Sequence, residues 1–322
     1  LKKKFGDVNI TAGGQTLVLQ FDRAMPDLLT ELSSARMAVF RSSEKSGLIG
    51  TGPFRVTTWE PGHKLTLYAF EDYWAGRPFL DAVTINLGTT RDTGDVFDIP
   101  FSQTRRVLPE RIRIWSSRVR ELIALVSDNV QPGVMEALAL AIDRAPIVNV
   151  LAQKRGEAAF GLLPQWLSGY AFLFAAPGKQ TASQIRTAPL TLSYPANGAF
   201  ERSIAERVAL NARDSGITLQ PTQNPNGSIR MVRWPLESTD AAAELSRIAT
   251  MLGVPELANS LNSSKPETLY DGERALLDSH RVIPILYLPQ VYGVAPRVHN
   301  WEAAQKNSGG FALRLDNIWV DP

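Results

Sequence analysis

The stretch that most constrains the fold is residues 50–81, GTGPFRVTTWEPGHKLTLYAFEDYWAGRPFLD. Gly50 to Pro53 predicts a tight turn, because glycine tolerates unusual backbone angles and proline presets one of them. Apolar and polar residues then alternate, as they do in strands with one buried face. The pattern predicts strands at residues 54–59, 65–68 and 80–87, with a hairpin turn at 60–63 and an aromatic-bearing loop at 71–78.

The offsets in this stretch resemble the signature region of bacterial extracellular solute-binding proteins of family 5, the peptide-, dipeptide- and nickel-binding components of ABC importers. The family pattern is a GTGPF-type turn, a strand ending in W-x-P-G, a second strand, and then D-Y-W-x-G-x-P-x-L-D. The residues that fit it are Gly50, Thr51, Gly52, Pro53, Phe54, Trp59, Pro61, Gly62, Asp72, Tyr73, Trp74, Gly76, Pro78, Leu80 and Asp81. An ordinary hairpin with a turn-rich exit explains the strands but not the whole set of spacings.

Residues 134–156, VMEALALAIDRAPIVNVLAQKRG, resemble a second family segment, an R-x-A-L-x-x-A-I-D-R helix followed by another helix and a glycine. The matching residues are Ala137, Leu138, Ala141, Ile142, Asp143, Arg144, Ile147, Val148 and Gly156. We expect Asp143 to cap the second helix and Pro146 to lie in its first turn, where a missing N–H costs little. Asp143 and Arg144 are therefore interpreted as a cap and a surface ion pair, not as catalytic charges.

Two shorter segments follow the first signature. Residues 94–99, GDVFDI, resemble the family segment that ends in G-x-x-D-I, although the helix that precedes it in the family is hardly present here. Six arginines then occur between residues 105 and 120. We interpret them as charged residues on the solvent-exposed face of a strand. The alternative is a binding site for a phosphate or for the carboxylate of a peptide.

Composition narrows the classes of function. With 44% apolar and 20% charged residues, the 322-residue chain is typical of a soluble globular protein with more than one lobe. A formal net charge of +2 gives no reason to expect nucleic acid or a membrane surface as partner. The absence of cysteine excludes disulfides, thiolate metal sites and cysteine nucleophiles. The three histidines lie far apart, and no P-loop, dinucleotide fingerprint or G-x-S-x-G elbow is present, so we expect no cofactor, no metal site and no catalysis.

A strand–helix–strand unit is predicted over residues 190–220. Its helix carries Phe200, Ile204 and Val208 at i, i+4 and i+8, and Gly216 follows as a stop. Such a unit predicts parallel strands joined by a crossover helix. Together with the resemblance, it predicts an α/β, two-lobed, periplasmic-binding-protein-like (type II) fold, in which much of the N-terminal lobe segment of a typical family member is lacking.

The resemblance also implies a division into lobes. Residues 1–47 are expected to be a remnant of the N-terminal segment that packs on lobe I, residues 48–130 and 288–322 to form lobe I, and residues 131–287 to form lobe II. The pattern further predicts strands at 16–21, 229–234, 281–287 and 313–320, and helices at 27–40 and 267–277.

Four residues are candidates for ligand binding. Trp234 and Glu237 fit a family motif in which an acidic residue pairs with the α-ammonium group of a bound peptide, although Ser238 and Ala241 depart from that motif. The alternative is a strand-to-helix loop with Glu237 or Asp240 near a helix N-terminus, and both readings stand. The resemblance implies that Trp234 and Tyr287 are cleft aromatics, and that Asn129 belongs to a cleft-lining stretch.

The resemblance implies an extracytoplasmic solute-binding protein of an ABC transporter that holds a small, peptide-like solute in an interlobe cleft without breaking a bond. We expect a monomer that works with a membrane permease, binds no nucleic acid and is periplasmic or extracellular. The chain begins with Leu1, which predicts a processed or truncated product whose missing beginning held an export signal or a membrane attachment. The alternatives are the ligand-sensing domain of a transcription regulator with the same fold, and a hydrolase of a class that no motif here identifies.

Overall fold

The computed structural model describes residues 8–22, 28–32, 37–43, 47–88, 94–101, 111–174, 187–196, 198–261, 265–302 and 314–322. The chain divides into two compact units, residues 1–90 with 300–320 (unit 1) and residues 91–299 with 321–322 (unit 2). The lobe boundaries expected from the resemblance stay a prediction, because compact units are not by themselves the lobes that close on a ligand. Within the described ranges, no helix combines the length and apolar character needed to cross a bilayer.

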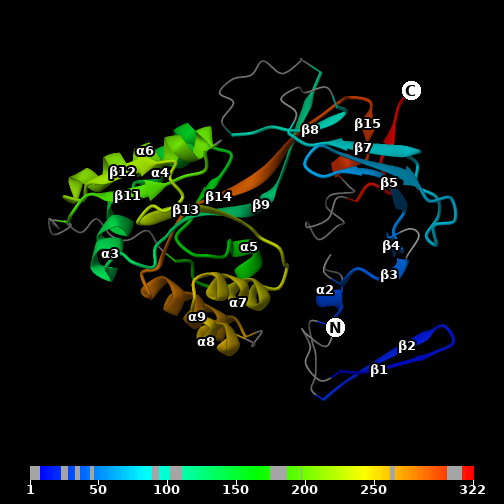
Figure 1. Ribbon diagram of the computed structural model, residues 1–322, viewed down its shortest axis with the longest axis horizontal. Coiled ribbons are helices and arrows are strands. Elements are labelled where there is room, and N and C mark those ends of the chain that lie inside the picture. Colours follow the sequence, from blue (N-terminus) through cyan, green and yellow to red (C-terminus); the bar gives the residue numbers. More distant parts are fainter. Residues whose placement is uncertain are drawn as a thin grey trace. The chain divides into compact units, whose positions relative to one another are not determined.

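Unit 1 consists mainly of antiparallel strand pairs (Figure 1). Its elements are β1 (Val8–Gly13), β2 (Thr16–Phe21), α2 (Leu28–Leu32), β3 (Phe40–Ser43), β4 (Gly47–Gly50), β5 (Phe54–Glu60), β6 (Lys64–Ala69), β7 (Ala82–Asn86) and β16 (Trp319–Val320). Strands β5, β6 and β7 form one sheet in that order, which confirms the strands predicted from the signature stretch. Gly62 makes the predicted hairpin turn with a φ of 77°, an angle that a residue with a Cβ adopts only under strain.

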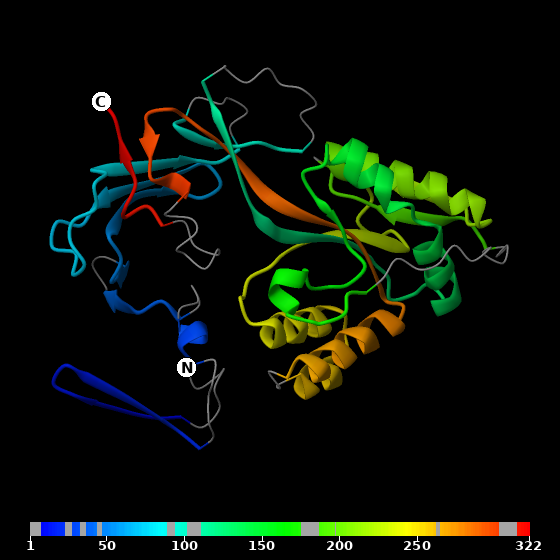
Figure 2. The same ribbon diagram turned by 180° about the vertical axis from the view of Figure 1, so that it is seen from behind.

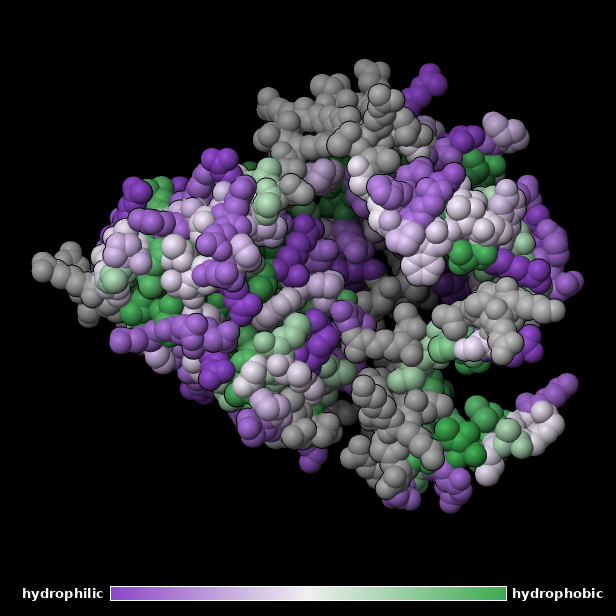
Figure 3. All heavy atoms as spheres, viewed as in Figure 1, coloured by the Kyte–Doolittle hydropathy of each residue, from purple (hydrophilic) through white to green (hydrophobic). Residues whose placement is uncertain are grey.

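The β1–β2 hairpin confirms the strand predicted at residues 16–21. Its apolar side chains are largely exposed, with Leu17 at 60% and Val18 at 51% of full exposure. Figure 3 shows a group of apolar residues, in green, over this hairpin. The hairpin therefore contributes little to the buried core of unit 1.

The helix predicted at residues 27–40 is wrong in its extent. The helix α2 covers only Leu28–Leu32, and Phe40 begins β3, which pairs with β4. Strand pairing at Phe40–Ser43 satisfies backbone groups that a continued helix would have used, so the apolar stripe alone did not decide the structure. The rest of that prediction falls on residues 27 and 33–36, outside the described residues.

Unit 2 is an α/β unit around one mixed sheet. Its elements are β8 (Val96–Asp98), β9 (Arg113–Val126), α3 (Pro132–Ala141), α4 (Arg144–Pro146), the π-helical turn η2 (Ile147–Leu151), β10 (Glu157–Ala158), α5 (Gln165–Ser168), β11 (Leu190–Ser193), α6 (Ala199–Asp214), β12 (Leu219–Thr222), β13 (Ile229–Pro235), α7 (Ala241–Met251), α8 (Pro255–Ser260), α9 (Pro266–Asp278), β14 (Val282–Val294) and β15 (Val298–His299). The strand order is β10-β14-β9-β13-β11-β12, with β8 also paired to β14. Figures 1 and 2 show α6 on one face of this sheet and α7 and α9 on the other.

The predicted crossover unit is confirmed. Strands β11 and β12 are parallel, with Leu190 opposite Leu219, and α6 connects them. Phe200, Ile204 and Val208 of α6 are buried against the sheet, as their spacing predicted. Removing these side chains from water is the main stabilising contribution of the helix. The helix and strand predicted at 267–277 and 281–287 are likewise found, as α9 and the first part of β14.

Side chains of the central strands alternate between the two faces of the sheet. On β9, Ile123 and Leu125 join the core under α6, whereas Leu122 points to the other face. On β13, Ile229 and Met231 belong to the α6 face, so Arg233 does too. This alternation decides which residues lie on the same face as the pocket described below.

The expected surface ion pair at Asp143 and Arg144 is wrong for Arg144. Asp143 does cap α4, accepting the N–H of Ala145 at 3.1 Å. The Arg144 side chain, however, is buried and donates to the carbonyls of Pro284 at 2.7 Å and Ala159 at 2.9 Å. Burial lowers the pKa of this guanidinium to about 10. The guanidinium has several fixed N–H donors, so one arginine can bind carbonyl groups from separate segments of the chain. The adjacent position of Asp143 in the sequence gives no indication of these distant partners.

Glu273 of α9 is fully buried beneath the irregular segment at residues 159–174. Its Oε1 accepts the N–H groups of Leu162 at 2.5 Å and Leu163 at 3.1 Å. Its Oε2 is buried with no hydrogen-bond partner among the described residues. Burial raises the pKa of this carboxyl from 4.5 to about 7, against the opposing effects of the two N–H donors and of the nearby Tyr170 hydroxyl.

We expect the free energy of unfolding to fall as the pH rises from about 4.5 to about 7. In this window the unfolded carboxyl of Glu273 has lost its proton while the folded one retains it, so a higher pH favours the unfolded chain. The shift corresponds to a loss on the order of 3 kcal/mol. Urea denaturation followed by circular dichroism across this pH range measures it. Glu273→Gln should remove this contribution, whereas Glu267→Gln on the exposed first turn of α9 should retain it. Superimposable pH profiles for Glu273→Gln and the unaltered chain would contradict the assignment.

Candidate functional site

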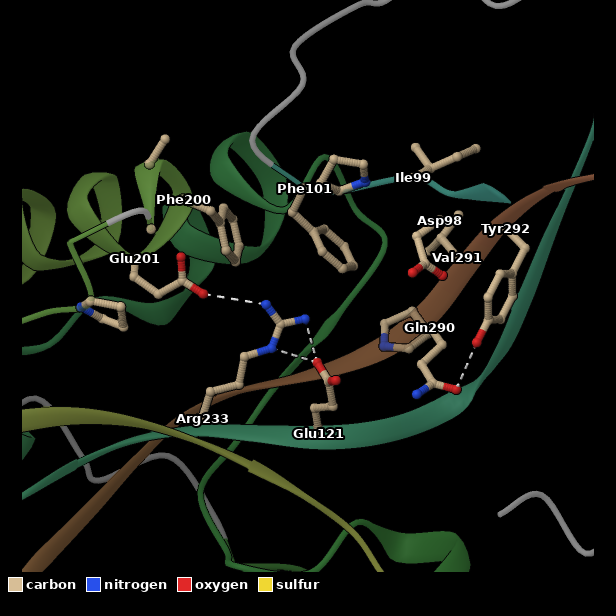
Figure 4. A pocket seen from close by; sticks show the side chains of 15 residues that line it. Asp98, Ile99, Phe101, Glu121, Phe200, Glu201, Arg233, Gln290, Val291 and Tyr292 are labelled. Carbon is tan, nitrogen blue, oxygen red and sulfur yellow. Dashed lines mark hydrogen bonds and ion pairs between the residues drawn. The ribbon is translucent and has the colours of Figure 1, made fainter. Parts of the chain in front are cut away.

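A pocket of about 540 Å³ lies on the α6 face of the sheet in unit 2 (Figure 4). A volume of this size falls in the range of small-molecule sites in proteins. Its lining comes from β8 and the residues after it, β9, the start of α6, β13 and the irregular part of β14. The lining residues are Asp98, Ile99, Pro100, Phe101, Glu121, Pro195, Gly198, Ala199, Phe200, Glu201, Arg233, Pro289, Gln290, Val291 and Tyr292.

Asp98 reaches the pocket from the end of β8. This short strand pairs with β14, where Phe97 lies opposite Gly293. A Cβ at position 293 would overlap the Phe97 ring, so the glycine allows β8 to lie close against β14. Asp98 is exposed as a residue, yet partial burial of its carboxyl raises the pKa of that group, and the nearby guanidinium of Arg233 only partly offsets this.

Arg233 is the cation of the pocket and is held between two carboxylates. Its Nε donates to Glu121 Oε2 at 2.6 Å, and its Nη1 donates to Glu201 Oε1 at 3.3 Å. The carboxylate side chains are only 15% (Glu121) and 9% (Glu201) exposed, whereas that of Arg233 is 42% exposed. Figure 4 shows this guanidinium between Glu121 of β9 and Glu201 of α6. The three charges therefore tie three elements together at one side of the pocket.

Aromatic and amide groups complete the wall. The rings of Phe101 and Phe200 stack with centroids 5.3 Å apart and planes inclined by 29°. On the opposite side the Tyr292 hydroxyl donates to Gln290 Oε1 at 3.3 Å. Two register shifts in β14, on either side of Pro289, displace this part of the strand from regular pairing, as bulges do beside many binding sites.

The charge balance of the lining is negative. Asp98, Glu121 and Glu201 provide three carboxylates against the single guanidinium of Arg233. Among the residues that the structure describes, no cluster of three histidine or carboxylate side chains has the arrangement to hold a metal ion. The net negative lining favours a cationic group over an anionic one.

Trp234 and Tyr287, two of the residues predicted from the sequence, lie on the opposite face of the sheet. Leu122 pairs with both of them, with Trp234 on β13 and with Tyr287 on β14, so the three side chains form one row across the strands. Both aromatics are buried, and the Tyr287 hydroxyl donates to the Gly161 carbonyl at 2.6 Å. The structure therefore brings these two residues near one another, but away from the lining of the pocket.

Glu237 and Asn129 lie at opposite ends of a strand pair. Glu237 follows the carboxyl end of β13, is exposed, and donates its backbone N–H to Glu244 Oε2 at 3.1 Å. Asn129, also exposed, follows the carboxyl end of the antiparallel neighbour β9. Asp240 caps α7 by accepting the N–H of Ala242, as the alternative interpretation of this loop expected. The binding roles of all four sequence-predicted residues stay predictions.

The residues that line the pocket were not identified as a site from the sequence. A signal existed for one of them, because Asp98 lies in the GDVFDI segment that resembles a family motif. The other three charged residues, Glu121, Glu201 and Arg233, are separated by up to 112 residues. In the sequence each is typical of a charged residue on the exposed side of a strand or helix. Only pairing of β13 with β9, and packing of α6 beside them, brings these charges together.

Part of the chain matches the model of a known protein family. Residues 8–95 match the model described as "Bacterial extracellular solute-binding proteins, family 5 Middle". The nickel-binding protein NikA of Staphylococcus aureus is 37% identical over 81 residues, which cover 24% of this chain and 16% of that protein. The oligopeptide-binding protein AppA of Bacillus subtilis is 29% identical over 130 residues, covering 35% and 23%. The matched parts thus amount to less than a quarter of either relative.

Solved structures share the fold at low sequence identity. NikA from Staphylococcus aureus in complex with Ni(L-His)2 has a TM-score of 0.76 at 17% identity, covering 98% of this chain and 79% of that one. DppA from Helicobacter pylori with the peptide STSA has 0.73 at 12%, covering 98% and 74%. A dipeptide-binding protein from Pseudoalteromonas sp. SM9913 with Met-Leu has 0.72 at 14%, covering 97% and 75%. These likenesses confirm the predicted fold class, the α/β fold of periplasmic binding proteins.

Replacing Arg233 with Met should destabilise the chain by about 1–3 kcal/mol. The change leaves Glu121 and Glu201 facing one another without their cation. The cost lies between that of a buried pair and that of a surface pair, because Arg233 is partly exposed. Urea denaturation measures it against Arg202→Met, which breaks the exposed Arg202–Glu206 pair and should leave the stability almost unchanged. Adding Glu121→Gln to Arg233→Met should recover part of the loss. Equal effects of the two arginine substitutions would contradict the structural role of Arg233.

Proposed function

We propose that the chain belongs to the bacterial extracellular solute-binding proteins of family 5. In this proposal it captures a small, peptide-like solute outside the cytoplasm and delivers it to the membrane permease of an ABC transporter. The observation that carries this proposal is the match of residues 8–95 to the family model. The shared fold of the structures with bound Met-Leu and STSA supports the peptide-like class, since those proteins hold peptides.

Capture of this kind needs binding groups and no chemistry. A pocket with preset charged, amide and aromatic groups orients a solute without a nucleophile or a metal. The unit 2 pocket supplies such groups, with Arg233 fixed by two carboxylates before any solute arrives. We therefore propose a binding protein without catalytic activity that works as a monomer, in the periplasm or at the outer face of the membrane.

The regulator interpretation gains no specific support. The relatives and structures named above are described as binding proteins for nickel or peptides. For the proposed function, Trp234, Glu237, Tyr287 and Asn129 remain the residues that the family resemblance nominates for the ligand.

Binding should be detectable with three solutes taken from the related structures, Met-Leu, the peptide STSA and Ni(L-His)2. A solute present at a hundredfold excess over its Kd should stabilise the folded chain by about 2.7 kcal/mol, which raises its melting temperature. Differential scanning fluorimetry finds the binders, and isothermal titration calorimetry measures their affinity. We expect at least one peptide to bind. The proposed function would be overturned if none of the three solutes gave a shift in melting temperature or a binding heat.

A further inference from the structure

We propose that residues 161–170 of unit 2 form a lid over Tyr287, that the Glu273 side chain fastens this lid to α9, and that loss of a proton from that side chain releases it. The inference goes beyond the proposed function and does not depend on which solute the chain binds. Figures 1 and 2 show the short helix of the lid, α5, beside α7 and α9 on the face of the sheet opposite to α6.

The lid is a buried segment with little regular structure. Seven of its ten residues are buried, and its regular part is the short helix α5. Among the described residues, its backbone–backbone hydrogen bonds join lid residues to one another, such as the N–H of Ser168 to the carbonyl of Pro164 at 3.0 Å. Buried backbone groups need partners, so the attachment of the lid to the rest of unit 2 depends on side chains.

Glu273 makes the attachment to α9. Its Oε1 accepts the N–H groups of Leu162 at 2.5 Å and Leu163 at 3.1 Å, so one oxygen holds two consecutive backbone donors of the lid. Gly161 allows this approach, because a Cβ at that position would lie 2.6 Å from the same oxygen. The lid is therefore shaped to receive this carboxyl.

Tyr287 lies under the lid. Its side chain is buried, and its hydroxyl donates to the Gly161 carbonyl at 2.6 Å. A second contact with the sheet is made from the lid itself, where Trp166 Nε1 donates to the Val119 carbonyl at 3.0 Å. Opening of the lid would thus expose Tyr287, one of the residues that the family resemblance nominates for the ligand.

The carboxyl of Glu273 is buried without a cation. Among the described residues, the groups that act on its pKa are the two N–H donors and the Tyr170 hydroxyl, and none of them is positively charged. Glu244 on the neighbouring helix α7 is equally buried, but it accepts a hydrogen bond from Arg247 Nε at 3.0 Å. Burial of an ionised carboxylate is costly when no cation accompanies it, and the neutral form avoids that cost.

The closed lid therefore retains the proton. The N–H donors and the Tyr170 hydroxyl favour the ionised form, but burial outweighs them and raises the pKa of Glu273 from 4.5 to about 7. In an open lid the carboxyl meets water and has its ordinary pKa. Between pH 4.5 and pH 7 each rise in pH therefore favours the open form, and outside this range opening no longer depends on this group.

Other ionisable groups also face Glu273 or the lid. They are Tyr170, Tyr270, Tyr287, Glu157 of β10, and Arg144, which binds the Ala159 carbonyl just before the lid. Burial raises the pKa of the Tyr170 and Tyr287 hydroxyls, and the pKa of Arg144 is about 10. These three groups keep one charge state over the pH range of the test, and the exposed Glu157 is examined there by substitution.

Hydrogen exchange followed by mass spectrometry at pH 5 and pH 7 tests the lid, with protection factors corrected for the pH dependence of intrinsic exchange. We expect peptides within residues 161–170 to lose protection by between about tenfold and a hundredfold from pH 5 to pH 7. At both pH values they should be less protected than peptides of α6, because the lid opens without unfolding of the whole unit.

Three kinds of variant separate Glu273 from its surroundings. Glu273→Gln keeps an acceptor oxygen and carries no charge, so protection of the lid should no longer change with pH. Glu157→Gln on β10 and Glu267→Gln on the exposed first turn of α9 should retain the change. Tyr170→Phe removes a hydroxyl that favours the ionised form, so the loss of protection should continue to a higher pH.

Several results would overturn the lid. One is equal protection of residues 161–170 and of α6 at both pH values, which would mean that the segment opens only when the whole unit unfolds. Others are protection that is the same at pH 5 and pH 7, or a pH dependence that survives in Glu273→Gln. If Glu273→Gln does not fold, a pH profile that Tyr170→Phe leaves unmoved overturns the role of Glu273. No solute is used, so this test is independent of the proposed function.

Discussion

The antiparallel ladder between β9 and β14 is the constraint on which the rest of unit 2 depends. It extends from Arg113 opposite Val294 to Val126 opposite Val282, and β13 continues the sheet on the other side of β9. Once these registers are set, alternation of side chains assigns every residue to a face. Arg233 and Trp234 are neighbours in the chain, yet one lines the pocket and the other lies in a buried row with Leu122 and Tyr287.

Ionisable groups in unit 2 have very different roles because their partners differ. Arg144 is buried among backbone carbonyls, so it holds α4 against β14 without a carboxylate. Arg233 lies between two carboxylates, which fix its guanidinium. Glu273 accepts backbone N–H groups with one oxygen, but its burial raises the carboxyl pKa, so its proton is retained at higher pH. In each case the residue type alone does not decide the role.

The family match and the candidate site rest on different parts of the chain. The matched residues 8–95 fall almost wholly in unit 1, where the signature turn and its three strands lie. The residues that line the pocket begin at Asp98 and belong to unit 2. The match therefore supports solute binding in general, whereas the nature of the solute has to be argued from charges and rings in unit 2.

Local structure and the class of the fold could be predicted from the order of the amino acids. The three strands of the signature stretch, the crossover unit and the cap at Asp143 follow from turn residues, periodicity and capping, which act over a few positions. That order did not determine where the helix after Leu28 ends, that Arg144 is buried, or that Glu121, Glu201 and Arg233 meet. Those outcomes depend on strand register and on packing between segments tens to hundreds of residues apart. Only the tertiary structure decides them, because a side chain's charge acts through the partners that the fold places beside it.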